Sequence, residues 1–342
     1  KEIEKSSILN QKDFTRAKET INFIKDKKWN SALKSASKVK DREFRNLINW
    51  MYLKTTRNGA SFSEYKNFIE QNSEYPRINR IRFLAEGKIY LRNNSPTSII
   101  NWFDKYPPLG GMGKIKLAEA YLEKGQTEKV QELIKEGWET ATISKNDLGY
   151  YRAKFKKFID SEDHIRRADY LAWEKKYWDL KRMLKYLPKD QRALYNARQI
   201  LMSNSYGVDN AISKVPEYLK KDPGLEFDRL RWRNRRGRLE GSLEILYRNS
   251  IKTEQQMVRP DKWWEQRESV VRSLIYKKRY KTAYKISSEH ALSAGPSFAE
   301  AEWLSGWIAL TFLNSPEYAI NHFQNFYNNV GYPISLARGA YW

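Results

Sequence analysis

Apolar residues recur at spacings of three and four along most of the chain, a pattern typical of helices that bury one face. Between Lys114 and Ile134 the pattern is interrupted at Gly125-Gln126-Thr127. This predicts two short helices joined by a tight turn. The same layout returns between Val270 and Ser287, where Lys278-Arg279 forms the predicted turn.

The second helix of each predicted pair carries a small residue near its start. The segment 303–326 repeats the layout, so that Ala283 and Ala319 stand at equivalent places with a period in the mid-thirties. Trp29-x-x-Ala32 near the start of the chain has the same spacing. A period of this length predicts an α-solenoid. We therefore expect an all-α chain of degenerate, TPR-like helix pairs that forms one extended domain over residues 1–342.

Composition narrows the class of protein and of partner. The 63 basic and 41 acidic residues give a net charge of +22, which favours polyanions such as nucleic acid, anionic lipid or an acidic polymer. The alternative is an evenly solvated basic surface, because these residues are spread over the whole chain. The absence of cysteine excludes disulfides and thiolate metal sites. No apolar run approaches the roughly 20 residues of a membrane span.

Two motifs suggest a metal or a nucleotide, and neither has the pattern that such a ligand needs. The three histidines are far apart, and none has a partner at metal-ligand spacing. Gly110-Gly111-Met112-Gly113-Lys114 opens a helix but lacks the spacing of a phosphate-binding loop and the Ser or Thr after Lys. We expect structural histidines, no bound metal and no cofactor.

A cluster of arginines between Arg229 and Arg238 is interleaved with one tryptophan. Such a cluster can bind phosphates or stack on bases and sugars. The alternative is that the arginines pair with nearby acidic residues, such as Asp228 and Glu240, and that the tryptophan is core. The candidate contacts to an anionic ligand or a glycan are Arg231, Trp232, Arg233, Arg235 and Arg236.

Several segments of the chain occur in an order that resembles a known family. They are Leu117-Ala118-Glu119-Ala120, Asp163-His164-x-x-Arg167, Asp222-Pro223-Gly224-Leu225, Arg231-Trp232-Arg233, Trp263-Trp264, Ala283-Tyr284, His290, Glu302-Trp303, His322-Phe323 and Pro333-Ile334-Ser335-Leu336. This series is similar to the superhelical domain of the large soluble lytic transglycosylases. The resemblance implies an α-superhelical ring on which a lysozyme-like catalytic domain sits.

That family cleaves the bond between N-acetylmuramic acid and N-acetylglucosamine in peptidoglycan and leaves a 1,6-anhydro end. The resemblance implies this activity for the parent protein, in the periplasm of a Gram-negative bacterium and without a cofactor. The segment Leu336 to Trp342 reads as a helix with no closing cap. We therefore expect the catalytic domain after Trp342, and a signal peptide removed before Lys1.

One segment looks like a catalytic motif of that family. Its enzymes use a Glu followed by Ser as general acid and then base, and Gln266-Arg267-Glu268-Ser269 looks similar. No Gly-Leu-Met-Gln stretch follows, and Trp263-Trp264 before it matches the superhelical domain instead. We interpret Glu268 as a surface or salt-bridged residue. No catalytic residue is assigned, and we expect this chain alone to be inactive.

The partners expected from this interpretation are peptidoglycan and the chain's own catalytic domain. Two other functions stay open at this point. One is a helical-repeat scaffold that binds a protein partner. The other is a solenoid that binds RNA or DNA, which the charge suggests, although the chain lacks a regular base-reading pattern in each repeat.

Overall fold

The computed structural model describes residues 6–203, 206–249 and 257–342, and all regular structure in these ranges is helical. This confirms the all-α prediction. The residues before Ser6, where the removal of a signal peptide is expected, lie outside the described ranges. The chain divides into two compact units between Arg167 and Ala168. Continuity as one domain over residues 1–342 stays a prediction.

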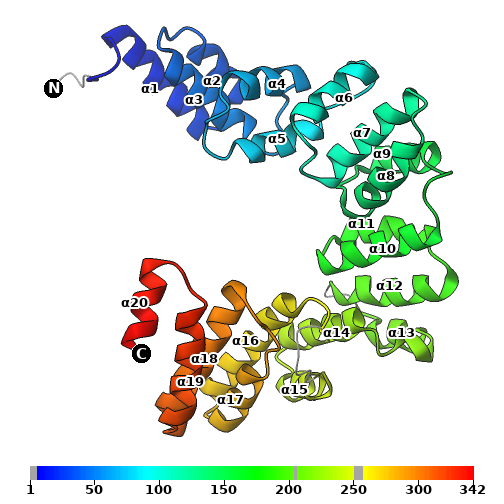
Figure 1. The fold of residues 1–342 in the computed structure, drawn as a ribbon, viewed down its shortest axis with the longest axis vertical. Helices are drawn as coiled ribbons and strands as arrows, with labels where there is room; N and C mark the ends of the chain where they lie inside the picture. Colours follow the sequence, from blue (N-terminus) through cyan, green and yellow to red (C-terminus); the bar gives the residue numbers. More distant parts are fainter. Residues whose placement is uncertain (1–5, 204–205, 250–256) are drawn as a thin grey trace. The chain divides into compact units, whose positions relative to one another are not determined.

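The described part of the first unit, from residue 6 on, holds nine helices and the start of a tenth (Figure 1). They are α1 (Gln11–Lys25), α2 (Trp29–Ala36), α3 (Arg42–Leu53), α4 (Phe62–Gln71), α5 (Ile78–Glu86), α6 (Pro96–Lys105), α7 (Gly111–Glu123), α8 (Glu128–Thr140), α9 (Lys145–Lys154) and α10 (Ser161–Trp173).

The described part of the second unit continues from the end of α10 with ten α-helices and two short 3-10 helices. They are α11 (Tyr177–Met183), η1 (Leu184–Tyr186), α12 (Lys189–Leu201), α13 (Val208–Ser213), η2 (Glu217–Leu219), α14 (Pro223–Arg235), α15 (Leu239–Arg248), α16 (Pro260–Tyr276), α17 (Tyr280–Ser288), α18 (Gly295–Leu313), α19 (Pro316–Asn328) and α20 (Pro333–Tyr341).

One turn geometry recurs between the helices of a pair. At five turns a residue takes a left-handed backbone conformation, and the N–H of the next residue donates to a carbonyl five residues back. This is the Schellman arrangement, which satisfies the last carbonyls of a helix. The left-handed residues are Lys27, Gly125, Lys175, Gly237 and Lys278. The second helix of the pair begins two or three residues later, so that each turn is also the start of α2, α8, α11, α15 or α17.

The small residues predicted at the pair junctions are fully buried. Ala32 and Ala283 have no exposed surface, and Ala319 is nearly as well enclosed. On the facing helix, a Cβ on Gly306 would lie 2.8 Å from the ring of Phe323. Helices α18 and α19 therefore approach so closely that glycine is required on one side of the contact.

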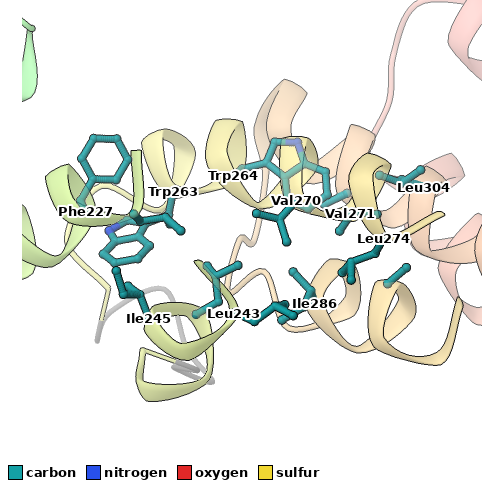
Figure 2. Close-up of a cluster of buried hydrophobic side chains, with 14 of the residues drawn as sticks. Phe227, Leu243, Ile245, Trp263, Trp264, Val270, Val271, Leu274, Ile286 and Leu304 are labelled. Atoms are coloured by element: carbon teal, nitrogen blue, oxygen red, sulfur yellow. The ribbon is translucent and has the colours of Figure 1, made fainter. Parts of the chain in front are cut away.

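The aromatic residues supply much of the core, as their abundance indicates. In the second unit, Trp263 and Trp264 of α16 lie among apolar side chains from α14, α15, α17 and α18, with Trp263 towards Ile245 and Trp264 towards Val270 (Figure 2). The ring of Phe227 on α14 lies 5.6 Å from that of Trp263, edge to face. Trp173 at the end of α10 belongs to the same cluster. Burial of a large apolar side chain contributes roughly 1.5–3 kcal/mol, so this cluster holds these helices together.

No helix in the described ranges is both long enough and apolar enough to cross a membrane.

Candidate functional site

The arginine cluster lies on the C-terminal half of α14 and on the turn into α15. Arg231 is buried, and its Nη2 lies 3.1 Å from Oδ1 of Asp228. Arg198 of α12 reaches the same carboxylate, with 2.9 Å between its Nε and Oδ2 of Asp228. Burial raises the pKa of Asp228, while Arg198 and Arg231 act in the opposite direction. Arg231 therefore belongs to a buried charge network and does not face solvent.

Arg233 and Arg235 connect helices. Arg233 donates to the carbonyl of Gly241 and pairs with Glu244 on α15 at 3.0 Å. Arg235 donates to the carbonyls of Leu201 and Met202 at the end of α12, at 2.6 and 3.0 Å. A cation at a helix C-terminus also interacts favourably with the helix dipole. Both side chains therefore have structural partners inside the second unit.

Three residues of the predicted cluster keep exposed surface. Arg235 and Arg236 are exposed and Trp232 is half-buried. The guanidinium carbons of Arg236 and Arg238 lie 4.6 and 4.9 Å from the centre of the Trp232 indole ring. These are cation–π distances. Of the five residues named from the sequence, Arg231 is buried, and Arg233 and Arg235 are tied to neighbouring helices by the contacts above.

A cleft of about 180 Å³ adjoins this exposed part, between the α14–α15 turn and α16. Arg238 lines it from the turn, and Ser269, Ser273 and Lys277 line it from α16 and its C-terminal end. Neither cation forms an ion pair with the described residues. Two cations and two hydroxyl groups around a small cleft suit a carboxylate or another small anion. The sequence analysis missed Lys277, because it lies far along the chain from the arginines.

Glu268 lies on α16 and accepts a hydrogen bond from Nε of Arg272, at 2.7 Å, one helical turn away. The residue has a cation beside it on the same helix. This placement agrees with a salt-bridged residue.

The glycine-rich start of α7 holds a carboxylate of the chain itself. Glu86 at the end of α5 accepts hydrogen bonds from the backbone N–H groups of Leu109 and Gly110. A Cβ on Gly113 would lie 2.5 Å from Cδ of Glu86. The glycines thus make room for an internal anion at a helix N-terminus, which leaves no space for a phosphate.

The three histidines all have structural partners. His164 accepts from the indole N–H of Trp138 at 3.1 Å, and burial, followed by Arg152, lowers its pKa. His290 and His322 both contact the carboxylate of Glu302. Within the described ranges, no group of three or more His, Cys, Asp or Glu side chains could hold a metal ion.

Apolar clefts border the last helix, α20. One of about 530 Å³ lies against α18 and is lined by Trp303, Tyr332 and Arg338, among others. Another of about 590 Å³ lies against α19 and is lined by Phe323 and Trp342, among others. Ile334, Tyr341 and Trp342 beside these clefts are exposed, whereas Leu336 is half-buried.

The chain shows little similarity to known proteins. No protein-family model matches the chain, and no curated protein matches it. One similar solved structure is the complex of the 70-kDa soluble lytic transglycosylase with bulgecin A, which is 11% identical. The match covers 94% of this chain and 75% of that one, with a TM-score of 0.32. A likeness at that level supports no conclusion about function.

Proposed function

We propose that this chain is the non-catalytic helical body of a soluble lytic transglycosylase and that it holds peptidoglycan in the periplasm. The proposal rests on the ordered series of family-like segments and on the structural roles of the residues in them. These residues cap helices, lie where helices cross or fill the space between them. The resemblance therefore concerns the helical body of the enzyme and not its reaction.

The segment Asp222-Pro223-Gly224-Leu225 illustrates this support. The Asp222 carboxylate accepts from the N–H of Leu225 at 2.8 Å and so caps α14. Pro223 occupies the first turn, where its missing N–H costs nothing. A Cβ on Gly224 would lie 2.3 Å from the guanidinium carbon of Arg198. Each residue of the segment is therefore explained by a junction between α12 and α14.

In this proposal, peptidoglycan is held through its charge. Its stem peptides carry carboxylates, and the chain carries a net charge of +22. The cleft between Arg238 and Lys277 is a site where one such carboxylate fits. The apolar clefts beside α20 are the surface that we assign to the catalytic domain, because exposed apolar patches of this kind mark protein contacts.

Co-sedimentation with purified sacculi tests the proposal. Binding should weaken as salt rises, because exposed charge pairs are screened. The triple variant Arg236→Ala/Arg238→Ala/Lys277→Ala should bind more weakly than Lys124→Ala/Lys157→Ala/Lys221→Ala, which removes the same charge from exposed positions elsewhere. Muropeptide analysis should find no anhydro products from this chain alone. Binding that is insensitive to salt, or no binding at all, would refute the proposal, and equal losses in the two variants would refute the assigned cleft.

A further inference from the structure

A second cleft, of about 310 Å³, lies in the first unit between α3 and α4. This is at the low end of the volumes of ligand sites. Its apolar lining comes from Leu33, Leu53 and Phe68, and its polar lining consists mainly of carboxamide side chains. We call this cleft the carboxamide groove. The carboxamides that line it are Asn46, Asn49, Asn67, Gln71 and Asn72.

The polar residues of the groove form one stripe on each helix. Asn46 and Asn49 are three positions apart on α3, while Glu64, Asn67 and Gln71 follow at spacings of three and four on α4. Residues at these spacings lie on the same face of a helix. Both stripes line one cleft, so an occupant would meet carboxamides from two sides.

Four of these carboxamides have unused hydrogen-bonding capacity. The side chains of Asn46, Asn49, Asn67 and Gln71 form no hydrogen bond with the described residues. By contrast, Asn72 donates to the carbonyl of Phe68 at 3.0 Å. Each free carboxamide offers two N–H donors and one carbonyl acceptor. Their convergence on one cleft indicates a ligand that needs donors and acceptors together.

The groove is nearly uncharged in a strongly basic protein. Among the residues that line it, Glu64 alone is ionisable with a charge at neutral pH. That carboxylate is already engaged, because it accepts from the backbone N–H of Ser61 at 2.8 Å and from its hydroxyl at 2.7 Å. A groove with an acidic residue at one end and no lysine or arginine does not select anions. The groove therefore offers its ligand amide hydrogen bonds and not a matching charge.

We propose that the carboxamide groove binds an extended peptide segment through its main-chain amide groups. A peptide group presents one N–H and one C=O, which an Asn or Gln side chain can match as a pair. The stripe from Glu64 to Gln71 is roughly 10 Å long at about 1.5 Å per residue. Three extended peptide residues, at about 3.3 Å each, have this length, and small side chains would enter the apolar floor.

An N-acetylated sugar is the other neutral ligand with amide groups, and the groove suits it less well. The apolar face of a sugar ring is covered best by an exposed aromatic face. The aromatic rings of the groove, Tyr52 and Phe68, are 8% and 6% exposed. The inference rests on the proposed function in one respect only, which is that it names the stem peptide of peptidoglycan as the source of the peptide.

Titration calorimetry of the full chain tests the inference with two probes. One is the stem tetrapeptide released from sacculi by an amidase, and the other is an N-acetylglucosamine tetramer. We expect the peptide to bind, and Asn49→Ala/Asn67→Ala/Gln71→Ala to weaken it about tenfold or more, because each hydrogen bond contributes modestly and the effects combine. The variant Asn22→Ala/Asn101→Ala removes exposed carboxamides from α1 and α6 and should bind as the original chain does.

Salt and a shape-conserving variant separate this site from the basic cleft. Variants of the groove should lose affinity equally at low and high salt. Asn67→Asp keeps the shape but removes the N–H donors, so it should weaken binding even if the triple variant folds poorly. A peptide that does not bind, or whose affinity the groove variants leave unchanged, would overturn the inference. So would binding of the sugar tetramer alone.

The outcomes also separate this inference from the proposed function. If sacculi bind and the groove variants bind them as strongly as the original chain, the groove inference fails and the proposed function stands. If the tetrapeptide binds in the groove while sacculi do not bind, the groove stands and the proposed function fails.

Discussion

Each unit contains buried glutamates, and Glu86 of the first unit and Glu302 of the second differ in how their charge is compensated. Glu86 is 3% exposed and Glu302 is 5% exposed. Burial raises the pKa of Glu86 to about 7, although backbone N–H groups oppose the shift. Burial also acts on Glu302, but hydrogen bonds from His290 and His322 outweigh it and lower the pKa to about 2. Hydrogen bonds from two imidazole rings thus overcome a desolvation that backbone amides leave uncompensated.

The hydrogen bonds of His290 and His322 show which ring nitrogen of each faces Glu302. Nδ1 of His290 accepts from the N–H of Leu292 at 3.0 Å, so Nε2 carries the proton that is donated to Oε1 of Glu302. Nδ1 of His322 lies 2.6 Å from Oε2, and its Nε2 lies 3.1 Å from the hydroxyl of Tyr284. This network joins α17, α18 and α19, whereas Glu86 joins α5 to the start of α7.

The largest effect should come from removing the acceptor in the second unit. Glu302→Ala leaves the buried His290 and the half-buried His322 without their carboxylate, and a buried polar group that loses its hydrogen-bond partner costs about 1–3 kcal/mol for each histidine. Hydrogen exchange in α17 to α19 should accelerate accordingly, while exchange in α7 should not change. Glu317→Ala, an exposed residue on α19, is the matched control. Equal protection in Glu302→Ala and Glu317→Ala would show that the network contributes nothing.

The two glutamates should respond to pH in opposite directions. Glu86 binds its proton more tightly in the folded state, so its contribution to stability is present below the unfolded pKa of about 4.5 and is lost as pH rises through about 7. The loss is about 3 kcal/mol. Glu302 contributes above its unfolded pKa and loses that contribution as pH falls towards about 2.

Hydrogen exchange of α7 across this pH window, corrected for intrinsic rates, measures the Glu86 contribution. The slope should disappear in Glu86→Gln, which does not ionise. If the original chain and Glu86→Gln show the same slope, the carboxylate is not the titrating group.

A smaller effect should follow from filling the space around Glu86. In Gly113→Ala the new methyl group would meet the carboxylate, and such overpacking costs about 1–3 kcal/mol. A Cβ on Gly149 of α9 would meet no atom within 4 Å, so Gly149→Ala should instead stabilise its helix by about 0.5–1 kcal/mol. Thermal unfolding of both variants checks the opposite signs. Destabilisation in both would point to a general intolerance of these helices.

The sequence analysis was right about local structure and incomplete about charged groups. The turn at Gly125 and the buried Ala283 follow from helical periodicity, which a short window of residues records. The sequence did not distinguish the buried arginines of the cluster from the exposed ones. Arg231 and Arg236 look alike in the sequence, yet one is buried against Asp228 and the other is exposed and lies over the half-buried indole of Trp232.

The carboxamide groove was missed although a signal for it exists. Asn67 and Gln71 share a face with Glu64, and Asn46 and Asn49 share a face on the preceding helix. A scan for carboxamides at helical spacing would have found both stripes. That the stripes line the same cleft follows only from how α3 and α4 pack.

The sequence by itself determined that this chain is helical, where its helices pair and which small residues lie at the crossings, because hydrogen bonds and apolar faces within a helix depend on neighbours a few positions away. The tertiary structure alone decided which charged side chains are buried and which partners they meet. Glu86 meets Gly110 and Glu302 meets His322 across intervals of twenty residues or more. No local pattern encodes such partners, since packing chooses them and burial then sets how strongly they bind.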